Sequence, residues 1–285
     1  MMAKITKPIK IHGGKDSLAS WIVGLMPPRC KNPNNPRPDD SGYLHYVEPY
    51  FGGGSVLLEN DPEGISEVVN DINGELVNFW NVLRCPSEFE LLHRFLEAAP
   101  FDQKRFDSLL RLTPGLGTCV DRAWRFFILC RQSLAGRMQG FSPVSRNRTR
   151  RGMNEQVSAW LNAIEGLPAV HARLKRVLIL NGDALDVIRQ QDGPRTLVYA
   201  DPPYVHSSRA TVGEYEHEMS EQDHAKLLLA LDEMKGRFLL SGYHSRLYDN
   251  HAKTRGWRCH EKQIHNHAAG GKTKRIMTEC VWCNY

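Results

Sequence analysis

The sequence predicts an α/β protein in which a mixed sheet carries helices on both faces and a helical domain is inserted between the two halves of the sheet. Short β-branched runs alternate with amphipathic segments near both ends of the chain, which is the pattern of βα units. Between residues 81 and 170 the apolar spacing is helical and shows no strand pattern. Aspartates follow three of the predicted strands, which marks one sheet edge as a candidate site.

The composition is that of an ordinary globular protein. The 285 residues are 41% hydrophobic and 24% charged, which suits one large α/β domain with an insertion. No apolar run approaches the roughly 20 residues that span a bilayer, and the first residues contain no apolar signal core. We therefore expect a cytoplasmic protein without a membrane partner.

The seven cysteines do not indicate a disulfide framework, because their number is odd and they are scattered along the chain. Cys280 and Cys283 are the closest pair, and two buried thiols in a terminal strand are expected there. The alternative is a zinc site completed by nearby histidines. The candidates are His260, His265 and His267.

The N-terminal segment predicts a strand or arm at residues 9–11, a Gly-Gly turn, and a helix over residues 18–26. Lys15 would lie beside the start of this helix, where an anion is favoured. The alternative is a turn without a ligand. Prolines and asparagines between residues 27 and 42 then predict an irregular surface loop.

A strand over residues 43–47 is expected to run through Glu48 into the triple-glycine turn Gly52–Gly54 and a helix. Glycines allow positive φ and let a ligand approach the backbone closely. The spacing matches neither the dinucleotide-binding fingerprint nor the P-loop.

The next predicted strand covers residues 65–69 and is followed by Asp71. An acid at this distance from a glycine turn is where nucleotide-binding sheets hold the ribose hydroxyls. Alternatively, Asp71 caps the helix predicted over residues 75–80, and the two roles are compatible.

Helices are predicted near residues 89–96, 121–134 and 157–164. Between the last two, four arginines occur in six residues with no acid among them, in a chain of formal net charge +5. Guanidiniums suit phosphate and base-edge contacts, and a solvated loop is the alternative. These residues are Arg146, Arg148, Arg150 and Arg151.

The sheet is predicted to resume with strands over residues 176–181, followed by Asp183, and over residues 196–200. A helix over residues 223–234 and strands over residues 237–241 and 277–284 complete it. A loop rich in glycine and lysine precedes the last strand and is either a contact with a polyanion or a solvated hairpin tip. Its basic residues are Lys272, Lys274 and Arg275.

The motif Asp201-Pro202-Pro203-Tyr204 directly follows a predicted strand. Proline fixes φ and cannot continue a ladder, so the Asp201 carboxylate, the Pro202 carbonyl and the Tyr204 ring have little freedom. A rigid pair of acceptors beside an aromatic face suits a flat heterocycle that carries an amino group. A surface turn is the alternative, but acids gathered along one sheet edge favour a ligand.

These motifs, in this order, resemble the Dam-type DNA adenine-N6 methyltransferases of the D12 class, in the alpha arrangement. The resemblance covers nearly the whole chain. It implies a Rossmann-like methyltransferase fold, with residues 1–80 and 171–285 as the catalytic domain and residues 81–170 as a helical target-recognition insertion. It also implies S-adenosylmethionine as cofactor, no metal, and a prokaryotic or phage-encoded cytoplasmic protein that acts on the nucleoid DNA.

The resemblance also implies roles for individual residues. The catalytic residues would be Asp201, Pro202, Pro203 and Tyr204. The cofactor would be bound by Lys10, Lys15, Glu48, Pro49, Phe51, Gly52, Gly53, Gly54, Asp71 and Asp183, with Asp71 on its ribose and Asp183 near its adenine. DNA would be bound by Arg146, Arg148, Arg150, Arg151, Lys272, Lys274 and Arg275. The chain departs from the family at Ile11, where an aromatic side chain usually stacks near the cofactor. Either Phe51 is expected to make that contact, or the affinity for the cofactor is expected to be weaker.

The expected catalysis is positioning plus electrostatic stabilisation. The adenine amino group would donate hydrogen bonds to Asp201 and the Pro202 carbonyl, and Tyr204 would stack on a base turned out of double-stranded DNA. A companion restriction nuclease and the target sequence are not predicted. The alternatives are a methyltransferase of the same fold that acts on cytosine N4, RNA or a glutamine side chain, and a catalytically silent DNA-binding module. Ser-Pro-Pro or Asn-Pro-Pro is more typical of the other methyltransferases, so Asp201 speaks against them.

Overall fold

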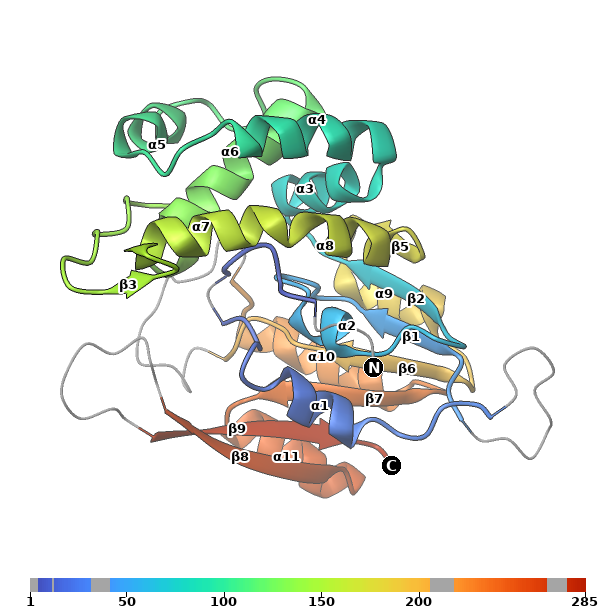
Figure 1. Cartoon of the computed structure of the whole chain (residues 1–285). Coiled ribbons are helices and arrows are strands. Elements are labelled where there is room, and N and C mark those ends of the chain that lie inside the picture. The colour runs from blue at the N-terminus through green and yellow to red at the C-terminus, as the bar shows by residue number, and fades with distance from the viewer. Residues whose placement is uncertain (1–4, 12, 32–41, 206–217, 266–275) are drawn as a thin grey trace. The chain divides into compact units, whose positions relative to one another are not determined.

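The computed structural model describes residues 5–11, 13–31, 42–205, 218–265 and 276–285 (Figure 1). It consists of two compact units, each assembled from three stretches of the chain. The helical unit comprises residues 1–20, 52–61 and 73–179. The sheet unit comprises residues 21–51, 62–72 and 180–285.

Seven of the described strands form one mixed sheet in the order β5-β2-β1-β6-β7-β9-β8. β1 pairs in parallel with β2 and β6, β6 pairs in parallel with β7, and β9 runs antiparallel to β7 and β8. This arrangement confirms the predicted mixed sheet, and the boundary between the two units falls within β5. The strands are β1 (His45–Glu48), β2 (Ser66–Asn70), β5 (Val177–Leu180), β6 (Thr196–Ala200), β7 (Arg237–Gly242), β8 (Arg258–His265) and β9 (Ile276–Cys283).

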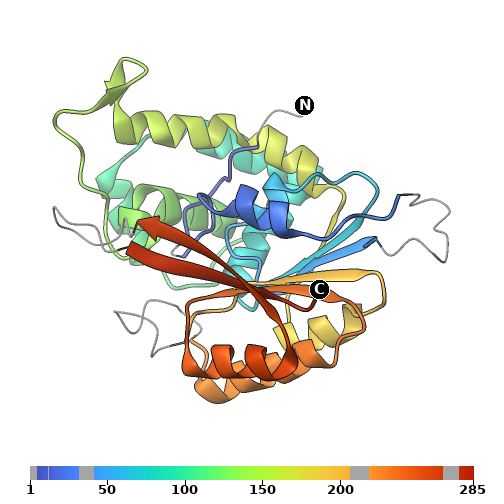
Figure 2. The ribbon, with the colours of Figure 1, turned by 90° about the horizontal axis from the view of Figure 1, so that it is seen from below.

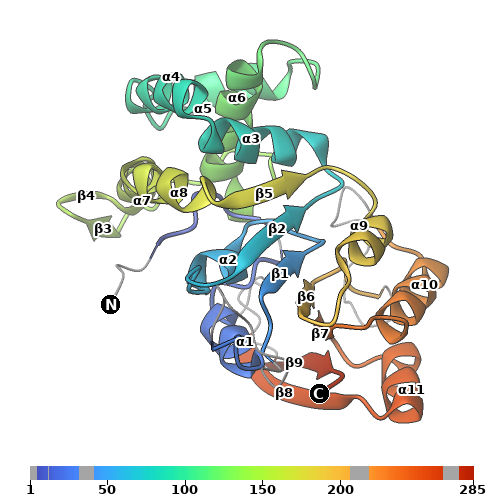
Figure 3. The ribbon, with the colours of Figure 1, turned by 90° about the vertical axis from the view of Figure 1, so that its right-hand side faces the viewer.

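Helices cover both faces of the sheet in the sheet unit. α9 (Ala184–Gln191), α10 (Glu221–Asp232) and α11 (Arg246–Arg255) lie on one face, whereas α1 (Ala19–Leu25) lies on the other (Figures 2 and 3). Burial of apolar side chains between the three helices and the sheet drives this packing. The core there includes Val198, Leu227, Phe238, Leu240 and Trp282.

Aromatic side chains hold the helical unit together. Phe79 of α3 stacks on Phe127 of α6 with ring centroids 6.0 Å apart, and Phe127 lies 5.4 Å from Trp160 of α7. A capping box between Thr118 and Asp121 begins α6. The helices are α2 (Ser55–Glu59), α3 (Gly74–Arg84), α4 (Pro86–Glu97), α5 (Gln103–Leu110), α6 (Cys119–Gln132), η1 (Leu134–Gly136), α7 (Glu155–Glu165) and α8 (Leu167–Leu174).

The expectation that residues 81–170 contain no strand is wrong. β3 (Thr149–Arg150) and β4 (Met153–Asn154) pair in a short antiparallel hairpin whose turn is Arg151 and Gly152, at φ 55° and 72°. Strands of two residues are too short to show periodicity, and glycine at positive φ closes the turn without steric cost. Residues 9–11, predicted as a strand or an arm, form no strand.

Candidate active site

Three acids lie along one edge of the sheet because the strands that precede them are parallel. Val47 of β1 pairs with Val198 of β6, and Glu48 pairs with Val69 of β2. Glu48 therefore ends the strand that lies between the strands preceding Asp71 and Asp201. The chain leaves β1 towards β2 on one side and later returns to β6 on the other, so this edge is the topological switch point where open α/β sheets bind ligands.

Glu48 is buried and accepts a hydrogen bond of 2.7 Å from the Tyr46 hydroxyl. Burial of Tyr46, together with the negative charge of Glu48, raises the pKa of this phenol well above its ordinary value. The phenol therefore stays protonated and remains a donor. A buried carboxylate with a fixed donor has a single, stable orientation.

Asn70 connects the loops that follow three strands. Its Nδ2 donates to the Pro49 carbonyl at 3.0 Å and to the Gly182 carbonyl at 3.1 Å, and its Oδ1 accepts from the Gly182 N–H at 2.9 Å. Its own carbonyl accepts from the Phe51 N–H at 2.8 Å. Asn70 is 1% exposed, and the sequence analysis did not select it. The only signal was a buried polar residue at the end of an apolar strand.

The alternative that Asp71 caps the following helix is wrong. Asn73 caps α3, since its side chain accepts from the Glu75 and Leu76 N–H groups at 3.0 Å each. Asp71 is half-buried, and its carbonyl accepts a hydrogen bond of 2.8 Å from the Asn181 side chain. The position of Asp71 beyond β2 therefore has no explanation in helix capping.

Asp183 lies at the same edge and caps α9. Its Oδ1 accepts from the Leu185 N–H at 2.8 Å and from the Asp186 N–H at 3.3 Å. The side chain is exposed. Its expected place near the cofactor adenine stays a prediction.

The Asp-Pro-Pro-Tyr segment is not a surface turn, because Pro202 and Tyr204 are buried. The Tyr204 ring meets the Tyr243 ring edge to face, with centroids 4.7 Å apart, and its hydroxyl donates to Glu279 of β9. Burial raises the pKa values of three phenols well above the ordinary range, and neighbouring charges, including that of Asp201, make a smaller contribution in the same direction. These are Tyr199, Tyr204 and Tyr248. The charge of Asp201 therefore acts on all three phenols.

In the helical unit, the glycine turn has the conformation that the sequence predicts. Gly52 and Gly54 have φ of 50° and 69°, and the Gly52 carbonyl accepts a hydrogen bond of 3.1 Å from Trp80 Nε1. A Cβ atom added at Gly53 would lie 3.9 Å from the Ile11 Cβ, so Ile11 lies against this turn. Lys15 is buried and donates to the Gly13 carbonyl at 3.2 Å.

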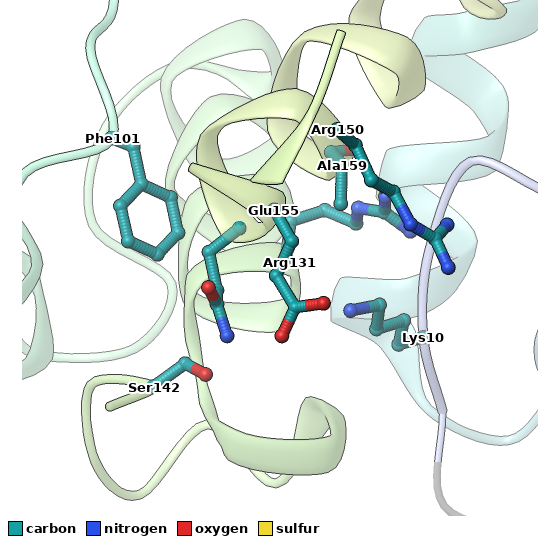
Figure 4. Close-up of a pocket in the computed structure, with 8 residues that line it drawn as sticks. Lys10, Phe101, Arg131, Ser142, Arg150, Glu155 and Ala159 are labelled. Atoms are coloured by element: carbon teal, nitrogen blue, oxygen red, sulfur yellow. The ribbon is translucent and has the colours of Figure 1, made fainter. Parts of the chain in front are cut away.

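A cavity of about 220 Å³ lies in the helical unit (Figure 4). Basic side chains gather on one side of it and Phe101 lies on the other. The Lys10 backbone is fixed there, because its carbonyl accepts a 2.7 Å hydrogen bond from the Cys130 thiol and leaves no room for a Cβ at Gly136. The lining residues are Lys10, Phe101, Arg131, Ser142, Arg150, Glu155, Gln156 and Ala159.

Three cations and one anion face this cavity. Desolvation and the nearby charge of Arg131 lower the pKa of Lys10, and Glu155 only partly offsets this. Arg131 donates to the Ala159 carbonyl at 2.8 Å, whereas its buried Nε has no hydrogen-bond partner within the part of the chain that the structure describes. The excess of positive charge favours an anionic ligand. The sequence analysis assigned Lys10 to the cofactor, and its location beside Arg131 was not predicted.

The arginine run is exposed, and its members differ in their contacts. Arg151 forms an ion pair with Glu165 at 2.9 Å and also donates to Asn162. Arg148 lies 3.8 Å from Glu155, and Arg150 lines the cavity. Lys272, Lys274 and Arg275 lie outside the described residues. The assignment of all seven residues to DNA stays a prediction.

The two cysteines of β9 are buried thiols, as expected for Cys280 and Cys283. No cluster of three or more His, Cys, Asp or Glu side chains suited to a metal ion occurs within the described ranges. The described helices likewise include none that is long and apolar enough to cross a membrane.

Comparisons with known proteins show the family of the chain. The chain is 26% identical to the Type II methyltransferase M1.LlaDCHI of Lactococcus lactis subsp. cremoris, over 97% of this chain and 94% of that protein. The precorrin 8w decarboxylase of Methanobacterium thermoautotrophicum covers 94% of this chain and 89% of its own, but at 11% identity and a TM-score of 0.37 this likeness carries no conclusion. Residues 12–266 match the family described as D12 class N6 adenine-specific DNA methyltransferase. Since this match spans most of the chain, the protein belongs to the D12 class of N6 adenine-specific DNA methyltransferases.

Proposed function

We propose that the sheet unit binds S-adenosylmethionine along the edge that carries Glu48, Asp71 and Asp201, and that it methylates adenine N6 at a specific site in double-stranded DNA. One observation carries this proposal: Asp201 directly follows β6, and Glu48 ends the neighbouring strand at the switch point of the sheet. Cofactor and target base would thus be held at adjacent strand ends.

The residues at this edge fit S-adenosylmethionine, whose sulfonium supplies the electrophilic methyl group. Asp71 is half-buried and directly follows β2, the position at which nucleotide-binding sheets hold a ribose, so its carboxylate is proposed to accept from two ribose hydroxyls. Glu48 is held in one orientation by Tyr46 and presents negative charge to a cationic ligand. Pro49, Phe51 and Asp183, which belong to the same unit, are part of this proposal. The roles expected for Lys10, Lys15 and Gly52–Gly54, which belong to the helical unit, stay predictions.

Asp201 and the Pro202 carbonyl are proposed to orient the adenine amino group. The N6 lone pair is delocalised into the ring, which makes this nitrogen a poor nucleophile. Two hydrogen bonds donated by the amino group, one to each acceptor, favour a pyramidal nitrogen that is aimed at the methyl group. The new bond would join this methyl carbon to N6, the carbon–sulfur bond would break to leave a neutral thioether, and one N6 proton would be released to solvent.

The target base has to leave the duplex, at a cost of a few kcal/mol. Stacking on the Tyr204 ring would recover part of this cost, because aromatic stacking on a base is worth about 1 to 3 kcal/mol. Pro203, between the two acceptors and this ring, limits the relative movement of all three.

The helical unit is proposed to bind the DNA backbone at the cavity that Arg131 and Arg150 line. Replacing Arg150 by glutamine is expected to weaken duplex binding by about 5- to 20-fold. The slope of the logarithm of the binding constant against the logarithm of the salt concentration is expected to fall by about 1, as for the loss of one phosphate contact. The matched control is Arg151→Gln, for which a smaller loss is expected because Glu165 already neutralises Arg151. Fluorescence anisotropy at several salt concentrations measures both quantities. Equal losses for the two variants would contradict the assignment of Arg150 to the backbone site.

Labelled methyl transfer from S-adenosylmethionine to unmethylated duplex DNA, followed by nuclease digestion, tests the proposal. Label in N6-methyladenine, with duplex preferred over single strands of the same sequence, is the expected result. Label in cytosine would overturn the proposed amino-group contacts, and label only in RNA would overturn the proposed partner. Mapping the modified sites would identify the target sequence.

A companion restriction nuclease is a second proposal, and the similarity to a Type II methyltransferase supports it. In that setting the chain would act on DNA in the cytoplasm and protect its sites from cleavage.

A further inference from the structure

Glu279 is a buried carboxylate beside the Asp-Pro-Pro-Tyr segment. It belongs to none of the motifs found in the sequence. It lies in β9 and is 1% exposed. Burial of a carboxylate is costly unless hydrogen bonds compensate for its lost hydration. Its contact with Tyr204 supplies such a hydrogen bond.

The direction of this hydrogen bond follows from the ionisation of Tyr204. Burial raises the pKa of the phenol well above its ordinary value, and the neighbouring charges of Glu279 and Asp201 raise it further. The phenol is therefore the donor and the carboxylate the acceptor. A hydrogen bond to a charged acceptor is stronger than one between neutral groups.

The segment from Asp201 to Tyr204 is thereby fixed at both ends. At its start, Ala200 belongs to β6 and pairs with Leu240 of β7. At its end, the Tyr204 hydroxyl is bound to Glu279, and the ring meets Tyr243 at 78°. Prolines fix φ but leave ψ free, so the two prolines alone do not set the position of the acceptors.

We infer that Glu279 is a positioning residue for methyl transfer: by holding the Tyr204 hydroxyl, it fixes the Asp201 carboxylate and the Pro202 carbonyl at the proposed site of the amino group. The inference rests on the proposed function. It assigns to β9, which pairs antiparallel to β7, a part in the chemistry at the ends of the parallel strands. Small displacements of catalytic groups have large effects on rate, so the loss of this contact acts mainly on the chemical step.

The test compares Glu279→Ala, Glu279→Gln and Tyr204→Phe in single-turnover methyl transfer. Glu279→Ala is expected to lower the rate by about 10- to 100-fold and to leave the Kd for S-adenosylmethionine within about twofold. Glu279→Gln keeps an oxygen acceptor and is expected to recover most of the rate. Adding Glu279→Ala to Tyr204→Phe is expected to cause little further loss, because the shared contact is already gone.

Ser241→Ala is the matched control. Ser241 is buried in β7, and its hydroxyl lies 3.0 Å from the Tyr199 hydroxyl, so this variant also removes a buried tyrosine contact from the sheet. Its single-turnover rate is expected to stay near that of the wild type. An equal loss in Ser241→Ala would show general loosening of the sheet and overturn the inference. The inference would also be overturned if the rate losses of Glu279→Ala and Tyr204→Phe were additive in the double variant, or if Glu279→Gln were as slow as Glu279→Ala.

The design separates this inference from the proposed function. If the wild type methylates cytosine or RNA, the proposed function fails, and the same variants are compared on the substrate that is modified. If Glu279→Ala does not fold, as judged by thermal unfolding, the comparison of single and double variants is made with Glu279→Gln and Tyr204→Phe. A Tyr204→Phe variant with the full wild-type rate would then overturn the inference, because the hydrogen bond would be absent without consequence.

Discussion

The Asp201→Ala variant is expected to lose methyl transfer by about 1,000-fold or more and to retain binding of S-adenosylmethionine. The carboxylate directly follows β6, its charge raises the pKa of three nearby phenols, and it is one of the two acceptors proposed for the amino group. Its removal leaves one hydrogen of N6 without an acceptor and removes the negative charge that favours a developing ammonium. Single-turnover methyl transfer measures the loss, and isothermal titration calorimetry measures cofactor binding.

Asp186→Ala is the control for this prediction. Asp186 is an exposed acid in the first turn of α9, and its carboxylate lies 3.5 Å from Arg189. Its removal is expected to leave the rate within about twofold of the wild type, as is usual for isolated surface pairs. An Asp201→Ala variant that keeps a tenth or more of the wild-type rate would remove Asp201 from the chemistry.

The strands of the sheet differ in how well the sequence predicts them. β6, with the sequence Thr-Leu-Val-Tyr-Ala, is fully buried and was predicted because β-branched and aromatic residues mark such strands. β8 was not predicted, because Arg258-Cys-His-Glu-Lys is polar and shows no apolar alternation. Its strand conformation comes from pairing with β9 along its whole length, which local sequence does not encode.

The acids of the site were predictable because each one follows a strand. Parallel strands present their carboxyl ends at one edge, so order along the chain is enough to gather Asp71, Asp183 and Asp201 there. Asn70 and Glu279 were not predictable in this way. The partner of Asn70 at Gly182 is 112 residues away, and Glu279 is 75 residues from Tyr204. Such contacts exist only after the sheet has formed.

The cavity in the helical unit also depends on contacts between residues that are far apart in the sequence. Lys10 and Cys130 are 120 residues apart, yet the hydrogen bond between them fixes the segment that carries the Lys10 side chain. The family resemblance implies that Lys10 binds the cofactor. Tertiary contacts place this lysine with Arg131 and Arg150, where its charge adds to theirs. Local pattern identified the residue but not its neighbours.

The Asn70→Ala variant is expected to be less stable by about 2 to 4 kcal/mol and to bind S-adenosylmethionine about 10- to 100-fold more weakly. The side chain makes three hydrogen bonds, to the Pro49 carbonyl and to both backbone groups of Gly182. Without them, buried backbone groups lose their partners, and the loops after β1 and β5 are no longer tied to β2. Those loops carry residues predicted to hold the cofactor, so stability and affinity are expected to fall together. Urea unfolding and calorimetric titration measure the two effects.

The matched control is Asn181→Ala at the same edge. Asn181 is exposed and donates to the Asp71 and Ile72 carbonyls at 2.8 and 3.3 Å. Water can replace these exposed hydrogen bonds, so a loss below about 1 kcal/mol is expected. Asn70→Asp keeps the acceptor for Gly182 but places a carboxylate against two carbonyl oxygens, and its affinity is expected to fall at least as far as that of Asn70→Ala. An Asn70→Ala variant that is destabilised yet binds the cofactor as the wild type does would show that the two loops keep their positions without Asn70, and that its role is confined to the stability of the sheet.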